Sequence, residues 1–300
     1  MSELRLTDDG TSLRVAHDGG ELLRYVYRPD DAQLESPRPY FHPLRTLGGR
    51  IVSLYRPHDH VWHKGLALSL PNVGSENFWG GTTYRRGIGY RQYDNDGSMR
   101  HRGFTGHTHE PGRVGASHRL DWVTQAGATW FTEERSFIVT TAPEAWALRF
   151  ETTFTSVAEE PVVIGSPTTE GRDNAGYGGL FWRGPRSFTD GVVRVPGRTG
   201  GDELMGVRAP WMAYTGRHDE TGGASTLLFA DDSPGTPVRW FVRANPFAAV
   251  CPAPFFDTEF PIAPGESLSL RYAVVIADGD HGDEGTAALA GIATGALAGR

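Results

Sequence analysis

The chain has 300 residues, of which 38% are hydrophobic, 22% charged and 11% aromatic, a composition that excludes a disordered protein. The formal net charge is −7 and no Lys/Arg-rich block occurs, so nucleic-acid binding has no electrostatic footprint. No stretch approaches the roughly 18 continuous apolar residues of a membrane span. The first residues contain no signal-peptide core, so we expect a cytoplasmic protein without a membrane partner.

The first thirty residues read as a meander of three strands, over residues 3–7, 12–17 and 22–28. Asp-Gly and Gly-Gly steps separate these strands, and they supply the positive φ that tight hairpins require. Asn95-Asp96-Gly97 predicts a further hairpin, which would join strands over residues 90–93 and 99–104.

Three later segments alternate apolar and polar residues, the period of a strand with one buried face. They cover residues 130–139, 146–155 and 268–276. In the clearest of them, Trp146, Leu148, Phe150 and Phe154 share one face. This alternation is typical of antiparallel sheets that cover a core on one side.

Helix is scarce, and only residues 283–298 favour one. The chain contains 39 glycines and 20 prolines, which suit many short strands joined by turns. No linker-like segment divides the sequence. We therefore predict an all-β fold, a large antiparallel β-sandwich with a short C-terminal helix, in which residues 1–300 form a single domain.

Two histidine clusters are the first candidates for chemistry. One comprises His58, His60 and His63, and the other is His107-Thr108-His109. Residues two apart on a strand share a face, so the members of each cluster can converge. Imidazole titrates near neutral pH and also ligates metals, so acid–base catalysis and metal binding both remain open.

Known metal and nucleophile motifs are missing from the sequence. There is no His-Glu-x-x-His helix, no paired Cys-x-x-Cys and no Gly-x-Ser-x-Gly elbow. The single cysteine, Cys251, excludes an internal disulfide framework. It lies in an apolar stretch, and we expect it to be a small buried hydrophobe.

Residues 166–183 combine a carboxylate, an amide, aromatic rings and two arginines with several glycines. Sugars need directional hydrogen bonds for their hydroxyls and aromatic rings for their apolar faces, and glycines let the backbone approach a ligand closely. Asn77-Phe78-Trp79-Gly80-Gly81 poses the same question with an amide, aromatic rings and glycines, and Trp79 is its candidate for stacking on a sugar. The alternative is that both segments consist of turns and core residues.

Several segments together resemble the bacterial PmoA family, a group named after a methane oxygenase component but otherwise of unknown function. They include Arg38-Pro39-Tyr40-Phe41-His42-Pro43-Leu44, Asn77-Phe78-Trp79 and Tyr177-Gly178-Gly179-Leu180-Phe181-Trp182-Arg183, and the resemblance spans about residues 38–278. Its sharpest motif is Asp-His-Pro-His-His-Arg-Gly. Asp59, His60, His63 and Gly65 match this pattern, whereas positions 61, 62 and 64 depart from it.

The resemblance implies a β-supersandwich like that of galactose mutarotases and related carbohydrate-active proteins. A true methane monooxygenase subunit needs membrane spans, which this sequence lacks, so we expect no oxygenase activity. The leading hypothesis is a carbohydrate-active enzyme that uses general acid–base chemistry on a sugar, of the epimerase or mutarotase, lyase or hydrolase type.

In this hypothesis His60 and His63 bind or protonate a sugar oxygen, His107 supports them, and Glu170 is the base. The expected substrate-binding residues, which hold hydroxyls or stack on the sugar, are Tyr40, Arg45, Asn77, Trp79, Tyr177 and Arg183.

Two other functions remain open. In the first, a divalent metal is held by histidines from His58, His60, His63, His107 and His109, and it polarises a keto-sugar carbonyl. In the second, the protein binds a sugar without catalysis. The leading hypothesis needs no cofactor, and exposed sheet edges favour pairing into a homodimer.

Overall fold

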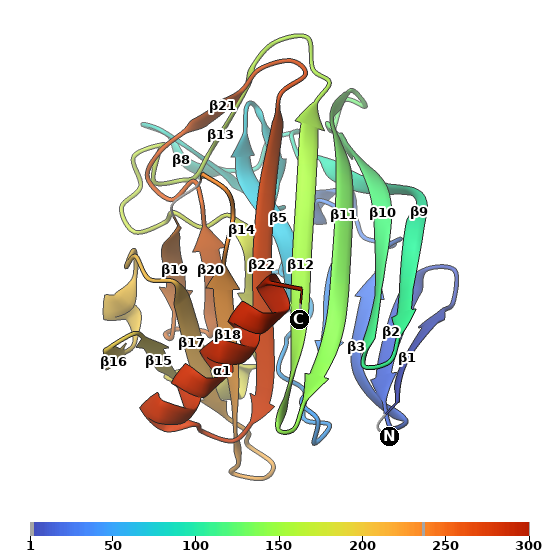
Figure 1. Ribbon diagram of the computed structural model, residues 1–300. Coiled ribbons are helices and arrows are strands. Elements are labelled where there is room, and N and C mark those ends of the chain that lie inside the picture. The colour runs from blue at the N-terminus through green and yellow to red at the C-terminus, as the bar shows by residue number, and fades with distance from the viewer. Residues whose placement is uncertain (1–2, 236–237, 300) are drawn as a thin grey trace.

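The computed structural model describes residues 3–235 and 238–299. This part of the chain contains 22 strands, which form a sheet of eleven, a sheet of nine and a two-stranded ribbon. The one α-helix among these residues, α1 (Gly282–Leu297), follows the last strand. The predicted all-β fold with a short C-terminal helix is confirmed (Figure 1).

The eleven-stranded sheet has the order β1-β2-β3-β4-β5-β14-β20-β19, with β6, β13 and β21 paired beside this path. Its strands are β1 (Leu4–Asp8), β2 (Ser12–His17), β3 (Gly20–Val26), β4 (Tyr40–Leu44), β5 (Leu66–Val73), β6 (Glu76–Phe78), β13 (Val162–Gly165), β14 (Gly179–Arg183), β19 (Arg239–Arg243), β20 (Ala249–Ala253) and β21 (Phe260–Ile262).

The nine-stranded sheet has the order β16-β15-β17-β18-β22-β12-β11-β10-β9. Its strands are β9 (Ser98–Glu110), β10 (Arg113–Val123), β11 (Thr129–Ala142), β12 (Ala145–Ser156), β15 (Val192–Val195), β16 (Arg198–Gly200), β17 (Trp211–Arg217), β18 (Ala224–Asp231) and β22 (Ser267–Asp278). The ribbon pairs β7 (Thr83–Arg85) with β8 (Gly89–Arg91), and three short 3₁₀ turns are η1 (Gln33–Glu35), η2 (Arg186–Phe188) and η3 (Asp202–Leu204).

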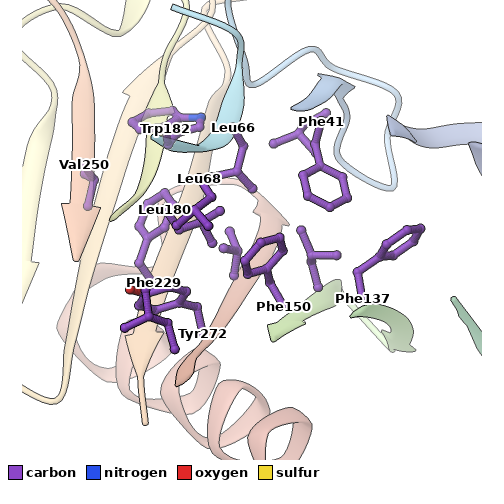
Figure 2. Close-up of a cluster of buried hydrophobic side chains, with 14 of the residues drawn as sticks. Phe41, Leu66, Leu68, Phe137, Phe150, Leu180, Trp182, Phe229, Val250 and Tyr272 are labelled. Carbon is purple, nitrogen blue, oxygen red and sulfur yellow. The ribbon is translucent and has the colours of Figure 1, made fainter. Parts of the chain in front are cut away.

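The main core fills the space between the two large sheets. Figure 2 shows Leu68 and Trp182 of the eleven-stranded sheet near Phe150 and Tyr272 of the nine-stranded sheet. Each of these side chains is at most 1% exposed. Burial of such large apolar side chains is the main favourable term in folding, so this layer holds the sheets together.

Strand β12 shows how the sequence pattern produces the layers. Trp146, Leu148, Phe150 and Phe154 all point into the core, as predicted. The opposite face is not uniformly polar, because α1 covers it (Figure 1). Ala145, on that face, packs against the helix in a second and smaller cluster with alanines of β22.

The predicted hairpin at Asn95-Asp96-Gly97 is wrong. Strand β8 pairs instead with β7, and β9 pairs with β10. The side chain of Asn95 donates to the Ser75 carbonyl and to Thr83, and Asp96 forms a bridge with Asn77. The residues that look like a turn are therefore buried anchors between β6 and β9.

No helix of the described residues is long and apolar enough to cross a membrane. Cys251 is fully buried on β20, as predicted, and burial raises the pKa of its thiol to about 12. A thiol with so high a pKa is not a nucleophile at neutral pH. The assignment of residues 1–300 to one domain stays a prediction.

Candidate functional site

A hollow lined mainly by aromatic side chains lies on the face of the eleven-stranded sheet that points away from the main core. Strand β14 shows why: Leu180 and Trp182 point into the core, and Phe181 between them points to the opposite face. The cavity there has a volume of about 600 Å³, within the range of small-molecule sites. Its lining residues are His60, Trp62, His63, Trp79, Thr82, Tyr90, Arg172, Ala175, Tyr177, Phe181, Phe241, Arg243, Asn245, Pro246 and Phe247.

Two successive turns bring His60 and His63 into this cavity. The amide of His60 donates to the Pro57 carbonyl, and the amide of His63 donates to the His60 carbonyl. His60 ends the first four-residue turn and begins the second, and His63 ends the second. Their rings stack with centroids 4.7 Å apart and an interplanar angle of 15°.

His63 is a buried, neutral imidazole with a defined tautomer. Burial, together with the charge of neighbouring Arg183, holds the pKa of His63 well below its ordinary value. Arg183 approaches Nδ1 of His63 with Nη1 at 3.1 Å. A guanidinium can only donate, so we assign the lone pair to Nδ1 and the proton to Nε2. His63 therefore offers an N–H donor on its other nitrogen.

His60 has the opposite arrangement. Its Nδ1 lies 2.9 Å from Oδ2 of Asp59. Although burial opposes it, hydrogen bonds from His60 and Arg186 hold the pKa of Asp59 below its usual range. An ionised carboxylate only accepts, so Nδ1 of His60 carries a proton, and Nε2 is the ring nitrogen that Asp59 leaves free.

The segment that carries these histidines is anchored from behind by a buried ion cluster. The Lys64 side chain is fully buried and lies 2.9 Å from Asp31, with a second contact to Glu35. Arg56 adds a 2.6 Å contact to Glu35. Because Arg56 and Lys64 flank the two turns, their shared carboxylate fixes both ends of the segment.

Trp62 is seated on two glycines. A Cβ on Gly81 would lie 2.7 Å from the Trp62 indole, and one on Gly80 would lie 2.6 Å from the Trp62 Cβ. Both glycines also have positive φ, so other residues there would be strained. Arg38, which is 1% exposed, donates to the Trp62 carbonyl at 2.8 Å. The position of this ring is thereby fixed.

Aromatic rings form a continuous row across the cavity. The centroids of His63 and Trp79 are 5.7 Å apart, and those of Trp79 and Tyr177 are 4.5 Å apart. Phe241 follows, 5.6 Å from Tyr177. Phe181 packs beside His63 at 4.8 Å. One end of the row therefore meets the imidazole pair, and the other end lies at β19.

The model of a family of unknown function, DUF6807, matches residues 12–291. The chain belongs to the DUF6807 family. The resemblance to the PmoA family is therefore wrong, since the family match covers nearly the whole sequence. No curated protein matches the sequence.

Several solved structures are similar to this DUF6807 chain. A GH36 alpha-galactosidase from Geobacillus stearothermophilus in complex with raffinose is 10% identical, with a TM-score of 0.44, and the alignment covers 93% of this chain but 41% of that one. A galactose 1-epimerase from Lactobacillus acidophilus is 8% identical (TM-score 0.39; 93% and 99% covered). A putative aldose 1-epimerase from Escherichia coli is 10% identical (TM-score 0.30; 93% and 99% covered).

The cavity of the DUF6807 chain brings together four of the predicted site residues: His60, His63, Trp79 and Tyr177. Arg183 is fully buried behind His63 and orients it. Its guanidinium also lies 3.7 Å from the centroid of the Phe247 ring. The remaining predicted residues do not line the cavity.

His107 lies on β9, the edge strand of the other large sheet. It is exposed, and its ring stacks on that of His109 at 6.2 Å. The predicted convergence within this pair is thus present, but the pair does not line the cavity that holds His63. His107 thus lies on an edge strand, whereas His60 and His63 lie in the turns between β4 and β5.

Glu170 lies in the turn after β13, and its carboxylate accepts from the Arg86 amide at 3.1 Å. Arg86 in turn donates to the Thr169 carbonyl at 2.6 Å, so this pair of contacts ties the turn to the β7–β8 ribbon. Glu170 does not line the cavity. The base expected at this position has a linking role instead.

Asn77 supports the cavity from within the protein. Its side chain accepts from the amides of Trp79 and Gly80 and donates to the Gly81 carbonyl and to Thr83. With 1% exposure and its hydrogen-bonding atoms occupied, it holds the Trp79 turn and has no atom left for a ligand.

Tyr40 and Arg45 also lie elsewhere. Tyr40 is buried and stacks on Tyr55 with centroids 5.0 Å apart. Arg45 donates to the Gly49 carbonyl and lines a separate polar depression with Glu21. Tyr40 is the first residue of β4, which pairs with β3, and Arg45 directly follows β4.

The described residues contain no group of three or more His, Cys, Asp or Glu side chains arranged to hold a metal ion. His58 is exposed and contacts Arg186 rather than the other histidines. The proposed set of His58, His60, His63, His107 and His109 is therefore not assembled, because its first three members lie in the β4–β5 connection, the other two lie on β9, and they contact different partners.

Sequence reasoning missed much of the lining, notably Tyr90, Arg172, Phe241, Arg243 and Phe247. Arg172 lies within residues 166–183, the predicted sugar-binding segment, so its place in the sequence was a signal that could have found it. Phe241 and Phe247 come from β19 and the turn after it, and only the pairing of β19 with β20 brings them to the cavity.

Proposed function

We propose that the aromatic cavity is the active site of a carbohydrate-active enzyme that moves a proton at the anomeric or carbonyl carbon of a sugar. The observation that carries this proposal is the stacked pair of imidazoles with opposite partners. Asp59 binds Nδ1 of His60 and leaves its Nε2 free, and Arg183 leaves His63 an N–H group.

The aromatic row supports a sugar as the ligand. Trp79 and Tyr177 present indole and phenol rings to the cavity, and such rings pack on the apolar faces of a pyranose. Thr82 and Asn245 add neutral polar groups to the lining, which suit directional hydrogen bonds to hydroxyls.

In the proposed reaction His60 is the general base. Its Nε2 takes the proton of the anomeric hydroxyl as the bond between the anomeric carbon and the ring oxygen breaks. The imidazolium that forms, stabilised by Asp59, then gives this proton to the ring oxygen. This role replaces the one expected of Glu170. An orienting carboxylate on the far nitrogen of a histidine is a recurrent arrangement in acid–base catalysis.

His63 is proposed as a neutral hydrogen-bond donor. Its buried ring stays uncharged, so its Nε2–H stabilises negative charge that develops on the carbonyl or ring oxygen of the sugar. The adjacent Arg183 makes a positive charge on His63 unfavourable, which keeps this donor neutral through the reaction.

The test is turnover with a panel of reducing sugars. Anomeric exchange and product formation are followed by NMR for the parent protein, for His60→Asn and for His63→Asn. His58→Asn is the matched control, since His58 belongs to the same segment but not to the cavity lining. Loss of turnover in the first two variants alone supports the proposal. Saccharide binding without turnover in the parent would instead identify a non-catalytic sugar-binding protein.

A further inference from the structure

The charge of the cavity lining differs from that of the whole protein. The chain carries a net charge of −7, yet the lining contains two arginines, Arg172 and Arg243, and no aspartate or glutamate. Arg172 is exposed and Arg243 is half-buried, so both charges are open to a ligand, and two cations without an acidic neighbour in the lining raise the local positive potential. This contrast points to a property of the ligand.

Arg172 stands at the rim of the cavity on the segment after β13. Its Nη1 donates to the Tyr90 hydroxyl, and its guanidinium lies 4.8 Å from the centroid of the Tyr90 ring. Tyr90 is also hydrogen-bonded to Tyr177 at 2.8 Å. Neutral phenols therefore position this cation, and no carboxylate of the described residues forms an ion pair with it.

Arg243 is the last residue of β19. Its Nη2 donates to the Asn174 carbonyl at 3.1 Å, and its guanidinium lies 5.6 Å from the Phe241 ring. Asn174 is two residues from Arg172, so Arg243 contacts the rim segment to which Arg172 belongs. Like Arg172, Arg243 has no ion pair with the residues that the structure describes.

The free donors of these two arginines suit an anion with several oxygens. A guanidinium has five N–H donors, and each contact described above uses one of them. The remaining donors match the fork geometry of a carboxylate or a phosphate. Neutral phenol and carbonyl partners leave the full positive charge available to such a group.

The anion-binding end and the imidazole pair lie at opposite ends of the aromatic row. His63 contacts Trp79, Trp79 contacts Tyr177, and Tyr177 contacts Phe241, over which Arg243 lies. A sugar on this row would present its reacting carbon to the imidazoles. A charged substituent elsewhere on the molecule would meet the arginines.

We propose that the ligand is an anionic sugar, whose carboxylate or phosphate is bound by Arg172 and Arg243. This inference rests on the proposed sugar-binding cavity and narrows its substrate class. It assigns recognition of the charged group to two residues that take no part in proton transfer.

Binding is measured by calorimetry with four probes. Galacturonate carries a carboxylate, its methyl ester is a neutral molecule of nearly the same shape, glucose 6-phosphate carries a phosphate, and glucose carries no charge. The first pair isolates the carboxylate and the second pair isolates the phosphate, so the two sources of the anion are distinguished.

The variants are Arg172→Gln and Arg243→Gln, which remove the charge and keep an N–H donor. Arg198→Gln is the matched control, since Arg198 is exposed on β16 of the other sheet. We expect each cavity variant to bind the preferred anionic sugar about 10- to 100-fold more weakly, as for a lost charged hydrogen bond. Neutral probes and the control variant should show no comparable change.

The outcomes separate this inference from the proposed catalysis. The inference is overturned if the neutral probes bind the parent protein as tightly as their anionic partners do. It is also overturned if the arginine variants bind each of the four probes with the affinity of the parent protein. Either result leaves the proposed catalysis standing. Arginine-dependent binding of an anionic sugar supports the inference, and it does so even where His60→Asn and His63→Asn retain full turnover, a result that would overturn the catalysis instead. Failure of the parent protein to bind any saccharide overturns both.

Discussion

The two histidine clusters have similar sequences and different surroundings. His60 and His63 stack inside a cavity, each with a charged partner on Nδ1. His107 and His109 also stack, but they are exposed on an edge strand. Both pairs therefore converge, and only one has partners that set which nitrogen carries the proton.

The difference shows that the residues hydrogen-bonded to an imidazole, and not the spacing of the histidines, decide which of its nitrogens carries the proton. Spacing along the chain brings two imidazoles together in either cluster. Asp59 and Arg183 then polarise one pair in opposite directions. The contact of Arg183 with His63 is buried, whereas that of Asp59 with His60 is partly exposed. Four predictions test this contrast, beginning with the largest effect.

Substitution of His63 should nearly abolish activity. We expect His63→Asn to lower turnover by about 10²- to 10⁴-fold, the usual contribution of one positioned catalytic group. The measurement is the initial rate of sugar conversion, with circular dichroism to verify folding. A folded His63→Asn protein with the parent rate would show that the polarised pair has no chemical role.

Removal of the buried ammonium behind the pair should destabilise the protein. Lys64→Met leaves Asp31 and Glu35 without their buried partner, so we expect a loss of about 3–5 kcal/mol in the free energy of unfolding. The control is Arg119→Met, which removes an exposed ion pair with Glu134 and should cost at most about 1 kcal/mol. Urea denaturation measures both, and equal costs would contradict the anchoring role.

The stability cost of His63→Asn should depend on pH. His63 stays neutral in the folded state and is protonated in the unfolded state below about pH 6.5, so acid favours unfolding of the parent through this residue. The His63→Asn variant lacks this acid destabilisation, because asparagine does not take up a proton. Its cost relative to the parent should therefore shrink by up to about 1.4 kcal/mol for each pH unit below 6.5.

This comparison between variant and parent is needed because other groups titrate in the opposite sense. Burial raises the pKa of Asp96 to about 7, so acid stabilises the fold through that carboxyl. Urea titrations at pH 7.5, 6.5 and 5.5 give the difference directly. A cost that stays constant over this range would mean that His63 is protonated normally in the folded state.

The smallest effect is expected from the exposed cluster. His107→Asn and His109→Asn should leave both turnover and saccharide binding within about twofold of the parent, because neither side chain lines the cavity. The same assays as for His63→Asn apply. A loss of more than tenfold in either variant would show that β9 contributes to the site.

The strands were predictable wherever one face is buried. Trp146, Leu148 and Phe150 alternate with polar residues because β12 has the core on one side, and this period is visible in the sequence. The hairpin at residues 95–97 was not predictable. Asn95 binds another segment through its side chain and Asp96 through its backbone, and turn-forming residues look the same in the sequence whether they form a turn or an anchor.

The site was predictable only in part. His60 and His63 are close in sequence, so two turns suffice to assemble them. Arg172 and Arg243 meet at one rim segment only because the sheet order places β19 beside that segment, and no local pattern encodes this order. Glu170 lies near the aromatic stretch in the sequence, but its carboxylate is turned toward the β7–β8 ribbon.

Lys64 has a practical consequence for handling the protein. It is the single lysine of the sequence, and its side chain is fully buried in the native fold. Amine-reactive dyes and crosslinkers therefore find no accessible lysine side chain until the structure opens. The fraction of Lys64-containing peptide that carries the label would thus measure the fraction of unfolded molecules, since each chain has one lysine, and no engineered probe is needed.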